Sequence, residues 1–485
     1  MHAPVISARP GDRVGAGGHS ARPLLLVGAA VATAAAAAYL AAIATHPLDA
    51  TLKGFDLRVY LGGAGQALSD QRDLYQWTYD GHQGIQFTYT PFAALLFAAG
   101  RAVPFAALMA IVTVVSVLAL GATVAIAFRE LGWRGAPRLG ATLLVTGLAL
   151  WTEPVQRALF LGQVEIVLMA VVTWDLCQPA GRRLAGAAAG VAAGIKLVPL
   201  LFIVYLLITR RHRQAAVAAA AFAVTAVTGF LAFPSASVTW WLHGDFLKAG
   251  RTGFVGGQQN QSLLGAATRL AGSVQAATFP WLLLALAVAA AGLAAAALSH
   301  GAGYSFAGLM TCALTALLVS PVSWDHHWAW IAPGLALLLD TAVRRTRSWS
   351  ATSARSAPAW SALTAVVLAC YAAWPEFWSA KAGLLGGGLI NYAPATAWAH
   401  GDNPAYREYH WHGLQLLAGN LEVIAGAALF LIALAAASLT LARPRQLQHR
   451  PPPAPTTRLA PPSVTVEPPP APSPPPPPIP PPPAP

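Results

Sequence analysis

The chain has 485 residues, of which 56% are hydrophobic and 10% are charged. Soluble domains carry about 25% charged residues, so this composition excludes an ordinary soluble domain. The formal net charge is +12, but the basic residues are dispersed among short segments between apolar blocks, which argues against nucleic acid as a partner.

The apolar residues fall into repeated blocks of about 15 to 25 residues, a length that crosses a bilayer as a helix. Backbone groups have to be paired inside lipid, and blocks rich in alanine and leucine do not alternate as barrel strands do. The sequence therefore predicts an all-α polytopic membrane protein with about 11–12 transmembrane helices. In chain order, the predicted spans lie near 24–44, 105–128, 139–152, 164–178, 214–233, 279–298, 303–320, 328–343, 358–374 and 417–442.

Lysine and arginine positions predict the orientation, because basic loops stay on the cytoplasmic side. Residues 1–23 are a predicted cytoplasmic N-terminal extension, since Arg9, Arg13 and Arg22 precede the first span. That span lacks a clear cleavage site and is interpreted as retained. Residues 24–442 form the transmembrane domain, and 443–485 form a disordered, proline-rich cytoplasmic tail. Two interpretations of the tail stay open, a docking segment for a proline-binding partner and a solvated segment with no partner.

The block 184–209, "LAGAAAGVAAGIKLVPLLFIVYLLIT", differs from the other spans because it has arginines at both ends. Its middle carries Gly194, Lys196 and Pro199. Glycine and proline break helices, and a lone lysine in lipid is costly. We therefore expect a hairpin of two half-helices with Lys196 at its outer tip, lining a watery cavity.

This orientation places four polar segments on the extracytoplasmic face. They are 45–90, taken as a long loop, 151–165 ("WTEPVQRALFLGQVE"), 250–270 around "GGQQNQS", and 320–328 ("SPVSWDHHW"). Ionisable residues at a membrane boundary are functional candidates, and their convergence on one face strengthens that interpretation.

Each candidate residue has a predicted role. Asp56 lies among apolar neighbours that raise a carboxyl pKa, which suits a general base. Anion or donor-phosphate binding is assigned to Lys196, His326, His327 and Arg58. Sugar or acceptor contacts are assigned to Tyr60, Tyr89, Gln163, Gln258, Asn260 and Asp325, the last of which can also orient a histidine. An Asp-His-His metal site is the minor alternative, and the three cysteines have no spacing typical of a metal site or a disulfide framework.

Five stretches carry a family resemblance, in order. They are "GFDLRVYLGGAGQAL", "LGQVEIVLM", "AAGIKLVPLLFIVYLL", "GGQQNQSLLG" and "SPVSWDHHW". Together they resemble the polyprenyl-phosphate-mannose-dependent α-1,2-mannosyltransferases of actinobacteria, which are membrane glycosyltransferases of the GT-C fold. The resemblance covers about residues 24–442.

The resemblance implies that a polyprenyl-phosphate-mannose donor and a glycolipid acceptor meet at the outer face of the bilayer. The acceptor is a phosphatidylinositol mannoside or lipomannan. Asp56 would deprotonate the acceptor 2-hydroxyl for direct, inverting displacement, while Lys196 and one of His326 and His327 stabilise the phosphate. It also implies chemistry without a cofactor, nucleotide or metal. A polyprenyl-phosphate-dependent arabinosyltransferase and a lipid-linked sugar transporter stay as alternatives.

Overall fold

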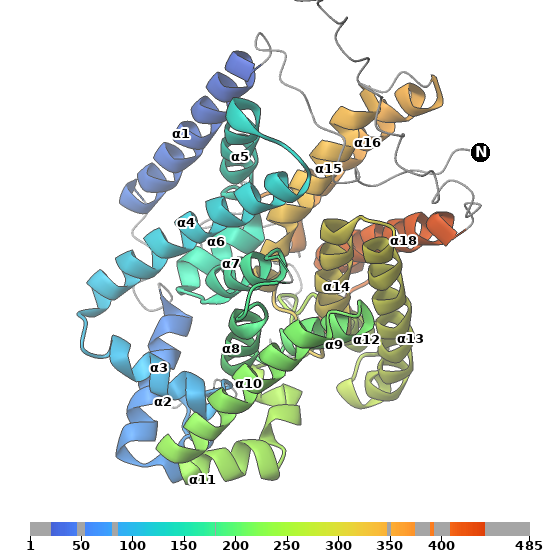
Figure 1. Ribbon diagram of the computed structural model, residues 1–485. Coiled ribbons are helices and arrows are strands. Elements are labelled where there is room, and N and C mark those ends of the chain that lie inside the picture. The colour runs from blue at the N-terminus through green and yellow to red at the C-terminus, as the bar shows by residue number, and fades with distance from the viewer. Residues whose placement is uncertain are drawn as a thin grey trace, which may run out of the picture. The chain divides into compact units, whose positions relative to one another are not determined.

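The computed structural model describes residues 21–45, 54–79, 86–179, 181–346, 351–373, 389–391 and 408–441. The predicted proline-rich tail and residues 1–20 of the predicted extension lie outside this part. The regular structure of the described residues is helical, with three isolated bridges between extended residues and no named strand. The predicted all-α class is confirmed, and Figure 1 shows the helices crossing one another at varied angles.

The helices have the following bounds in chain order. They are α1 (Ala21–Thr45), α2 (Phe55–Ser69), α3 (Pro91–Gly100), α4 (Phe105–Glu130), α5 (Gly135–Ala149), α6 (Glu153–Leu161), α7 (Glu165–Leu176), α8 (Ala187–Ile195), α9 (Leu200–Ile208), α10 (His212–Ala232), α11 (Pro234–Ser237), α12 (Leu263–Ala271), α13 (Val274–Gly301), α14 (Ser305–Val319), α15 (Ile331–Thr346), α16 (Ala351–Tyr371), α17 (Gly413–Gly419) and α18 (Leu421–Leu441). Short helical turns are η1 (Gln71–Asp73), η3 (Val238–Leu242), η4 (Asp245–Leu247), η5 (Ala249–Thr252), η6 (Asp325–Trp330) and η8 (Leu389–Asn391).

Five described helices are long and apolar enough to cross a membrane, namely α1, α4, α10, α13 and α18. The pair α6 and α7 adds a sixth candidate if it counts as one broken span, since the two helices meet at 114°. Most of the other predicted spans are shorter helices; α14, for example, has 15 residues. The count of 11–12 spans therefore stays a prediction for these shorter elements, which reach across a bilayer only with help from neighbours or local thinning.

The predicted break in 184–209 is confirmed as two helices, α8 and α9, separated at Lys196 and Pro199. Lys196 has an extended backbone with φ −136° and ψ 129°, which ends α8. By contrast, the segment 45–90 is not a plain loop. It contains the 15-residue helix α2, which packs against α3 around an aromatic cluster that includes Tyr60, Phe87 and Tyr89.

Close helix approaches depend on glycine. Where α1 meets α5, a Cβ on Gly140 would lie 2.8 Å from the backbone of Leu24, and a Cβ on Gly147 would lie 2.9 Å from the backbone of Ala32. Small residues let backbones pack this closely in membranes, where the hydrophobic effect between helices is weak. The glycines of α5 therefore determine the separation of the two helices.

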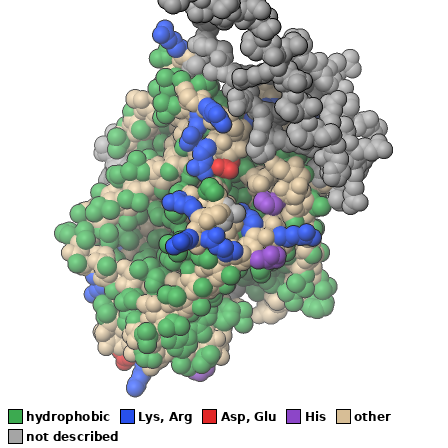
Figure 2. Space-filling view, viewed as in Figure 1, with side chains coloured by type: hydrophobic (Ala, Val, Ile, Leu, Met, Phe, Trp, Pro, Cys, Tyr) green, Lys and Arg blue, Asp and Glu red, His purple; other side chains and the backbone are tan. Residues whose placement is uncertain are grey.

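The surface is largely apolar, as Figure 2 shows for one face, with lysine and arginine side chains gathered in one region of it. Exposed leucines and valines occur along the long helices, among them Leu118, Leu231 and Leu431. An apolar exterior of this kind is expected of a protein whose solvent is lipid, because lipid tails contact such side chains without the cost that water imposes.

We predict that Gly140→Val destabilises the protein by about 1–3 kcal/mol, because the added side chain overpacks the contact with α1. The measurement is thermal unfolding in detergent. Gly121→Ala on α4 is the matched control, since its Cβ would lie 3.9 Å from Thr146, an ordinary contact. An unchanged unfolding midpoint for Gly140→Val would show that α1 and α5 do not need this close approach.

Candidate active site

Asp56 lies in the first turn of α2, whose start is fixed against α6. Gly54 precedes the helix in a left-handed conformation with φ 68°, and its backbone N–H donates to the carbonyl of Phe160 at 2.8 Å. The helix N-terminus favours a negative charge at this position. α6 in turn ends at Gly162, where φ is 71° and a Cβ would lie 2.9 Å from the side chain of Leu57.

Gln163 orients the Asp56 carboxylate. Its Nε2 donates to Asp56 Oδ2 at 2.5 Å. Its Oε1 accepts from the hydroxyl of Tyr60 at 2.5 Å and from that of Tyr89 at 3.3 Å, and the two hydroxyls are 2.7 Å apart. The two tyrosine hydroxyls donate to one end of the Gln163 amide, so that end is the oxygen. The amide nitrogen therefore points to Asp56. The sequence predicted sugar contacts for Tyr60, Tyr89 and Gln163, and these contacts stay predictions. In the structure Gln163 holds Asp56, and the two tyrosines hold Gln163.

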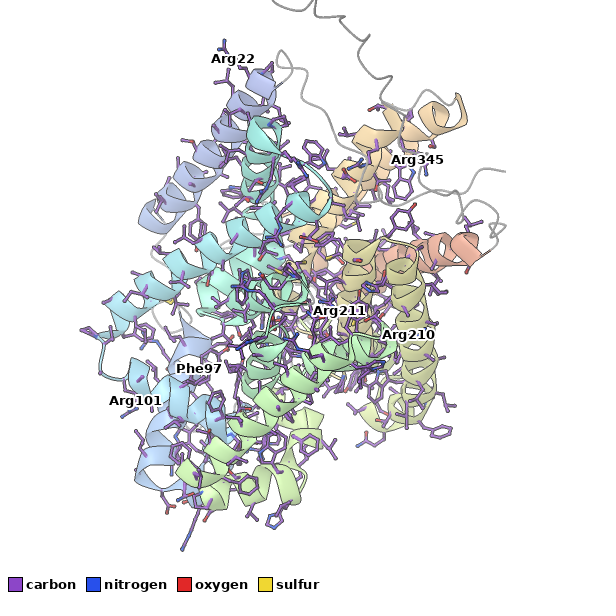
Figure 3. The ribbon with its side chains drawn as sticks, viewed as in Figure 1. Arg22, Phe97, Arg101, Arg210, Arg211 and Arg345 are labelled. Carbon is purple, nitrogen blue, oxygen red and sulfur yellow. The ribbon has the colours of Figure 1, made fainter. Side chains whose placement is uncertain are left out.

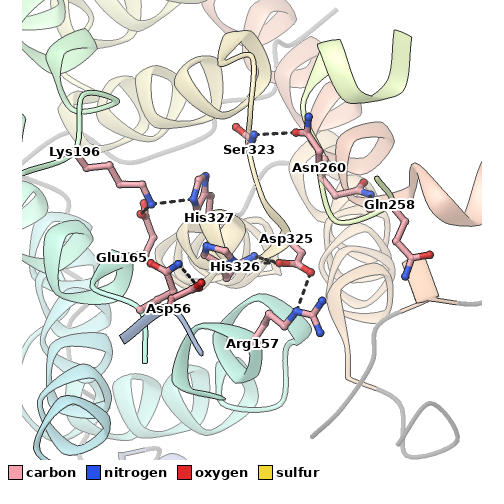
Figure 4. Close-up of polar contacts among 12 residues, drawn as sticks. Asp56, Arg157, Glu165, Lys196, Gln258, Asn260, Ser323, Asp325, His326 and His327 are labelled. Atoms are coloured by element: carbon pink, nitrogen blue, oxygen red, sulfur yellow. Dashed lines mark hydrogen bonds and ion pairs between the residues drawn. The ribbon is translucent and has the colours of Figure 1, made fainter. Parts of the chain in front are cut away.

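Asp56 is half-buried, and burial raises the pKa of its carboxyl. His326, the Gln163 hydrogen bond, Lys196 and Arg157 act in the opposite direction, because each favours the anion. Figure 4 shows Arg157 of α6, Lys196 of the α8–α9 break and His326 of η6 on the same side of the site as Asp56. A carboxyl with a raised pKa that remains able to ionise is suited to general-base work near neutral pH.

Lys196 is paired with a carboxylate that was not among the predicted site residues. Its Nζ lies 2.6 Å from Glu165 Oε2, at the start of α7, and 2.9 Å from His327 Nε2. An ammonium can only donate, so His327 Nε2 is the acceptor and its proton sits on Nδ1. A buried lysine needs a partner of opposite charge, and this rule is the signal by which an acid near Lys196 could have been expected.

His327 is neutral in this arrangement. Burial lowers the pKa of its imidazole well below the usual value, and the charges of Lys196 and His326 lower it further. The ring is perpendicular to that of His326, with centroids 4.7 Å apart. The predicted phosphate contact of His327 stays a prediction, and as a neutral ring it would act by hydrogen bonding rather than by charge.

Asp325 connects η6 to α6. Arg157 Nε lies 3.1 Å from Asp325 Oδ2, and Asp325 Oδ1 accepts the backbone N–H of His326 at 2.7 Å and lies 3.2 Å from His326 Nδ1. Burial opposes ionisation, but Arg157 and His326 together hold the pKa of the Asp325 carboxyl below its usual value. Asp325 therefore orients His326. This is one of the two roles that the sequence predicted for Asp325. Arg157 was missed, because the sequence gives no sign that its partner lies far along the chain.

The "GGQQNQS" segment supports η6 from the other side. Asn260 is fully buried; its Nδ2 donates to the carbonyls of Val255 and Pro321, and its Oδ1 accepts the N–H of Ser323 at 3.0 Å. The carbonyl of Gln259 accepts the N–H of Asp325 at 2.7 Å. Gln258 is buried in the same segment. The sugar contacts predicted for Gln258 and Asn260 stay predictions, and a ligand could reach the Asn260 amide only by displacing these bonds.

Arg58 does not join the network around Asp56 in the part of the chain that the structure describes. Its guanidinium lies 3.8 Å from the centroid of the Phe105 ring. Residues two apart on a helix do not face the same way, so Arg58 and Asp56 diverge from α2. The predicted phosphate contact of Arg58 stays a prediction. Within the described residues, no group of three or more His, Cys, Asp or Glu side chains is arranged to hold a metal ion.

Comparison with known proteins places the chain in a family. Residues 87–321 match the model of glycosyltransferase family 87. A Mycolicibacterium smegmatis protein named polyprenol-phosphate-mannose-dependent alpha-(1-2)-phosphatidylinositol pentamannoside mannosyltransferase is 34% identical over 292 residues, which are 59% of this chain and 69% of that relative. The chain belongs to glycosyltransferase family 87. It is a membrane glycosyltransferase of the GT-C type, and the family resemblance drawn from the sequence motifs is confirmed.

Further relatives of this family 87 member come from Mycobacterium tuberculosis. A pentamannoside mannosyltransferase of the same printed name is 33% identical and covers 60% of this chain and 67% of its own length. A polyprenol-phosphate-mannose-dependent alpha-(1-2)-phosphatidylinositol mannoside mannosyltransferase is 32% identical and covers 58% and 69%. No solved structure matches the chain. The matched family segment includes Gln163 and Lys196 but begins after Asp56 and ends before Asp325.

We predict that Gln163→Met moves the acid limb of the pH–rate profile to higher pH. The variant removes a hydrogen bond that favours the anion, so the pKa of Asp56 rises further. A base has to be ionised to accept a proton, so at acid pH a smaller fraction of the enzyme is active, and we expect about a tenfold loss of rate there. The measurement is kcat/KM for sugar transfer against pH. Gln66→Met, on the same helix as Asp56, is the control; an unshifted limb for Gln163→Met would exclude Asp56 as the group that titrates.

Proposed function

We propose that this family 87 enzyme transfers mannose from polyprenyl-phosphate-mannose to a mannosylated glycolipid, a phosphatidylinositol mannoside or lipomannan, and forms an α-1,2 linkage. The observation that carries the proposal is the Asp56 carboxylate, which is held by Gln163 and surrounded by imidazole, ammonium and guanidinium groups. The donor and acceptor classes come from the printed names of the relatives.

The proposed reaction is a single displacement with inversion. Asp56 accepts the proton of the acceptor 2-hydroxyl while the hydroxyl oxygen bonds to C1 of the donor mannose. The bond between C1 and the phosphate oxygen breaks, and its electron pair stays on the polyprenyl phosphate. Attack on the face opposite the leaving group converts a β-mannosyl phosphate into an α-mannoside, and Asp56 is left protonated.

His326 is the better placed of the two histidines to contact the departing phosphate. Its Nδ1 lies against Asp325, while its buried Nε2 has no hydrogen-bond partner among the described residues. His327 Nε2, in contrast, accepts from Lys196. With Nδ1 held by Asp325, Nε2 is the ring nitrogen of His326 that is left to face the developing negative charge.

We propose that this site opens to the extracytoplasmic side and that both termini are cytoplasmic. In Figure 3, Arg22 and Arg345, both predicted to lie inside, are in the upper part of the view and Arg101 is in the lower part, while Arg210 and Arg211, also predicted inside, lie between them. We expect single cysteines at Arg101 and Lys248 to react with an impermeant thiol reagent in intact cells and one at Arg210 to react only after lysis. The reverse pattern would overturn the orientation.

The function is tested with purified protein, polyprenyl-phosphate-mannose and a panel of phosphatidylinositol mannosides and lipomannan. We expect mannosylated products with an α-1,2 linkage, read by mass and linkage analysis. Asp56→Asn keeps the shape of the side chain but cannot accept a proton, so we expect a rate loss of about 10²–10⁴-fold. Donor binding should be nearly unchanged, and Asp70→Asn in the same region is the matched control. Turnover with GDP-mannose alone, or full activity of Asp56→Asn, would contradict the proposal.

A further inference from the structure

A cluster of buried acids lies behind the site, and the reaction described above does not use most of it. The acid cluster consists of Glu153 in the first turn of α6, Asp325 in η6 and Glu422 in the first turn of α18. Their exposed fractions are 0%, 1% and 1%. The start of α6 and the start of α18 both lie against the end of α16, because Thr152 bridges Ala372 and the Tyr371 hydroxyl donates to the Glu422 carbonyl. The Glu153 carboxyl interacts with those of Glu422 and Asp325. Three segments distant in the sequence thus bring three carboxyls to one place.

The positive charge at the acid cluster is insufficient for three carboxylates. The Nε of Arg157 is ion-paired with Asp325, and its positive charge also acts on Glu153 and Glu422. One guanidinium balances one carboxylate, and Asp325 also has the two contacts from His326. Asp325 is therefore the member of the cluster whose negative charge the structure compensates.

The two glutamates lack such compensation. Neither carboxyl oxygen of Glu153 has a hydrogen-bond donor among the described residues, and Glu422 Oε2 has none either. An ionised carboxylate without a donor or a cation is very costly to bury. Two carboxyls in reach of each other avoid that cost when they hold a proton between them, because an O–H then donates to the neighbouring oxygen.

We propose that Glu153 and Glu422 form a carboxyl pair that shares at least one proton and positions Asp325 in the transfer site. The pair fastens the first turn of α6 to the first turn of α18, and a protonated Glu153 can donate to Asp325. α6 carries Arg157 and leads directly into Gln163, the partner of Asp56. The pair therefore affects the reaction through the residues that it positions. The part of the test that measures mannose transfer rests on the proposed function.

The pair makes transfer sensitive to alkaline pH. Loss of its shared proton would leave three anions against one guanidinium, and their repulsion would separate α6 from η6. The charged and titratable groups that face the pair are Arg157 on α6, Asp325 and His326 on η6, and Tyr371 on α16, whose hydroxyl donates to the Glu422 carbonyl at 2.8 Å. Activity that requires the protonated pair is present at neutral pH and is lost as the pH rises.

The experiment compares Glu153→Gln, Glu422→Gln and Glu153→Leu with the wild-type enzyme in detergent. Glutamine is neutral and keeps a donor, so it replaces a protonated glutamate but not an ionised one. We expect both glutamine variants to retain transfer within about threefold and to extend activity to higher pH. Glu153→Leu removes the donor and should lose about tenfold, a usual consequence of one unsatisfied buried group. Glu130→Gln is the matched control, since Glu130 is paired with Arg129 on the surface and not with this cluster.

Infrared spectroscopy gives a readout that does not depend on transfer. The wild-type enzyme should show a carbonyl band of a protonated carboxyl at neutral pH that is lost in Glu153→Gln and unchanged in Glu130→Gln. If the band is present but no acceptor is mannosylated, the proposed function fails and the carboxyl pair stands. The carboxyl pair is overturned if the band is absent, if the glutamine variants are inactive though folded, or if all variants keep the wild-type pH profile.

Discussion

The ion pair between Arg157 and Asp325 joins the two elements that build the site, α6 and η6. Both partners are almost completely buried, with side-chain exposures of 8% and 1%. Removing either partner from such a pair leaves an uncompensated charge, which typically costs about 3–5 kcal/mol. Because Arg157 is fixed by Asp325, α6 is fixed, and with it the turn that presents Gln163 to Asp56. The orientation of the proposed base therefore depends on an ion pair made by the helix that leads into Gln163.

A second constraint concerns the charge available to a phosphate. Lys196 is shared between Glu165 and His327, so a lipid phosphate would meet an ammonium that is already neutralised. The phosphate therefore gains less binding energy from Lys196 than it would from a free lysine, unless Glu165 moves away. His326 faces no such competition at Nε2 within the described residues, because its contact with Asp325 is made through Nδ1. The division of roles between Lys196 and His326 thus follows from which of their atoms are already engaged: the Lys196 ammonium by Glu165 and His327, but only the Nδ1 of His326 by Asp325.

The long helices and the polar segments that meet at the site were predictable from local pattern. Asp56, Lys196 and the histidines stood out because ionisable groups are rare in a chain this apolar, and the structure brings them together. α2 and α6 were missed as helices because they are short, with 15 and 9 residues, and they lie in segments whose polar residues resemble loops. Glu165 and Arg157 were missed as members of the site because each is defined by a partner more than 30 positions away.

The sequence by itself determined the membrane class, the helical architecture and the break at Lys196. These features follow from composition and from residues within one helix turn, where glycine, proline and uninterrupted apolar runs act locally. Tertiary structure alone decided the charge state and orientation of the site. Whether His327 is neutral, which carboxylate holds Arg157, and which atoms of Gln163 face Asp56 are set by burial and by partners from other helices. A pKa or an ion pair depends on distance in space, and separation along the chain does not report that distance.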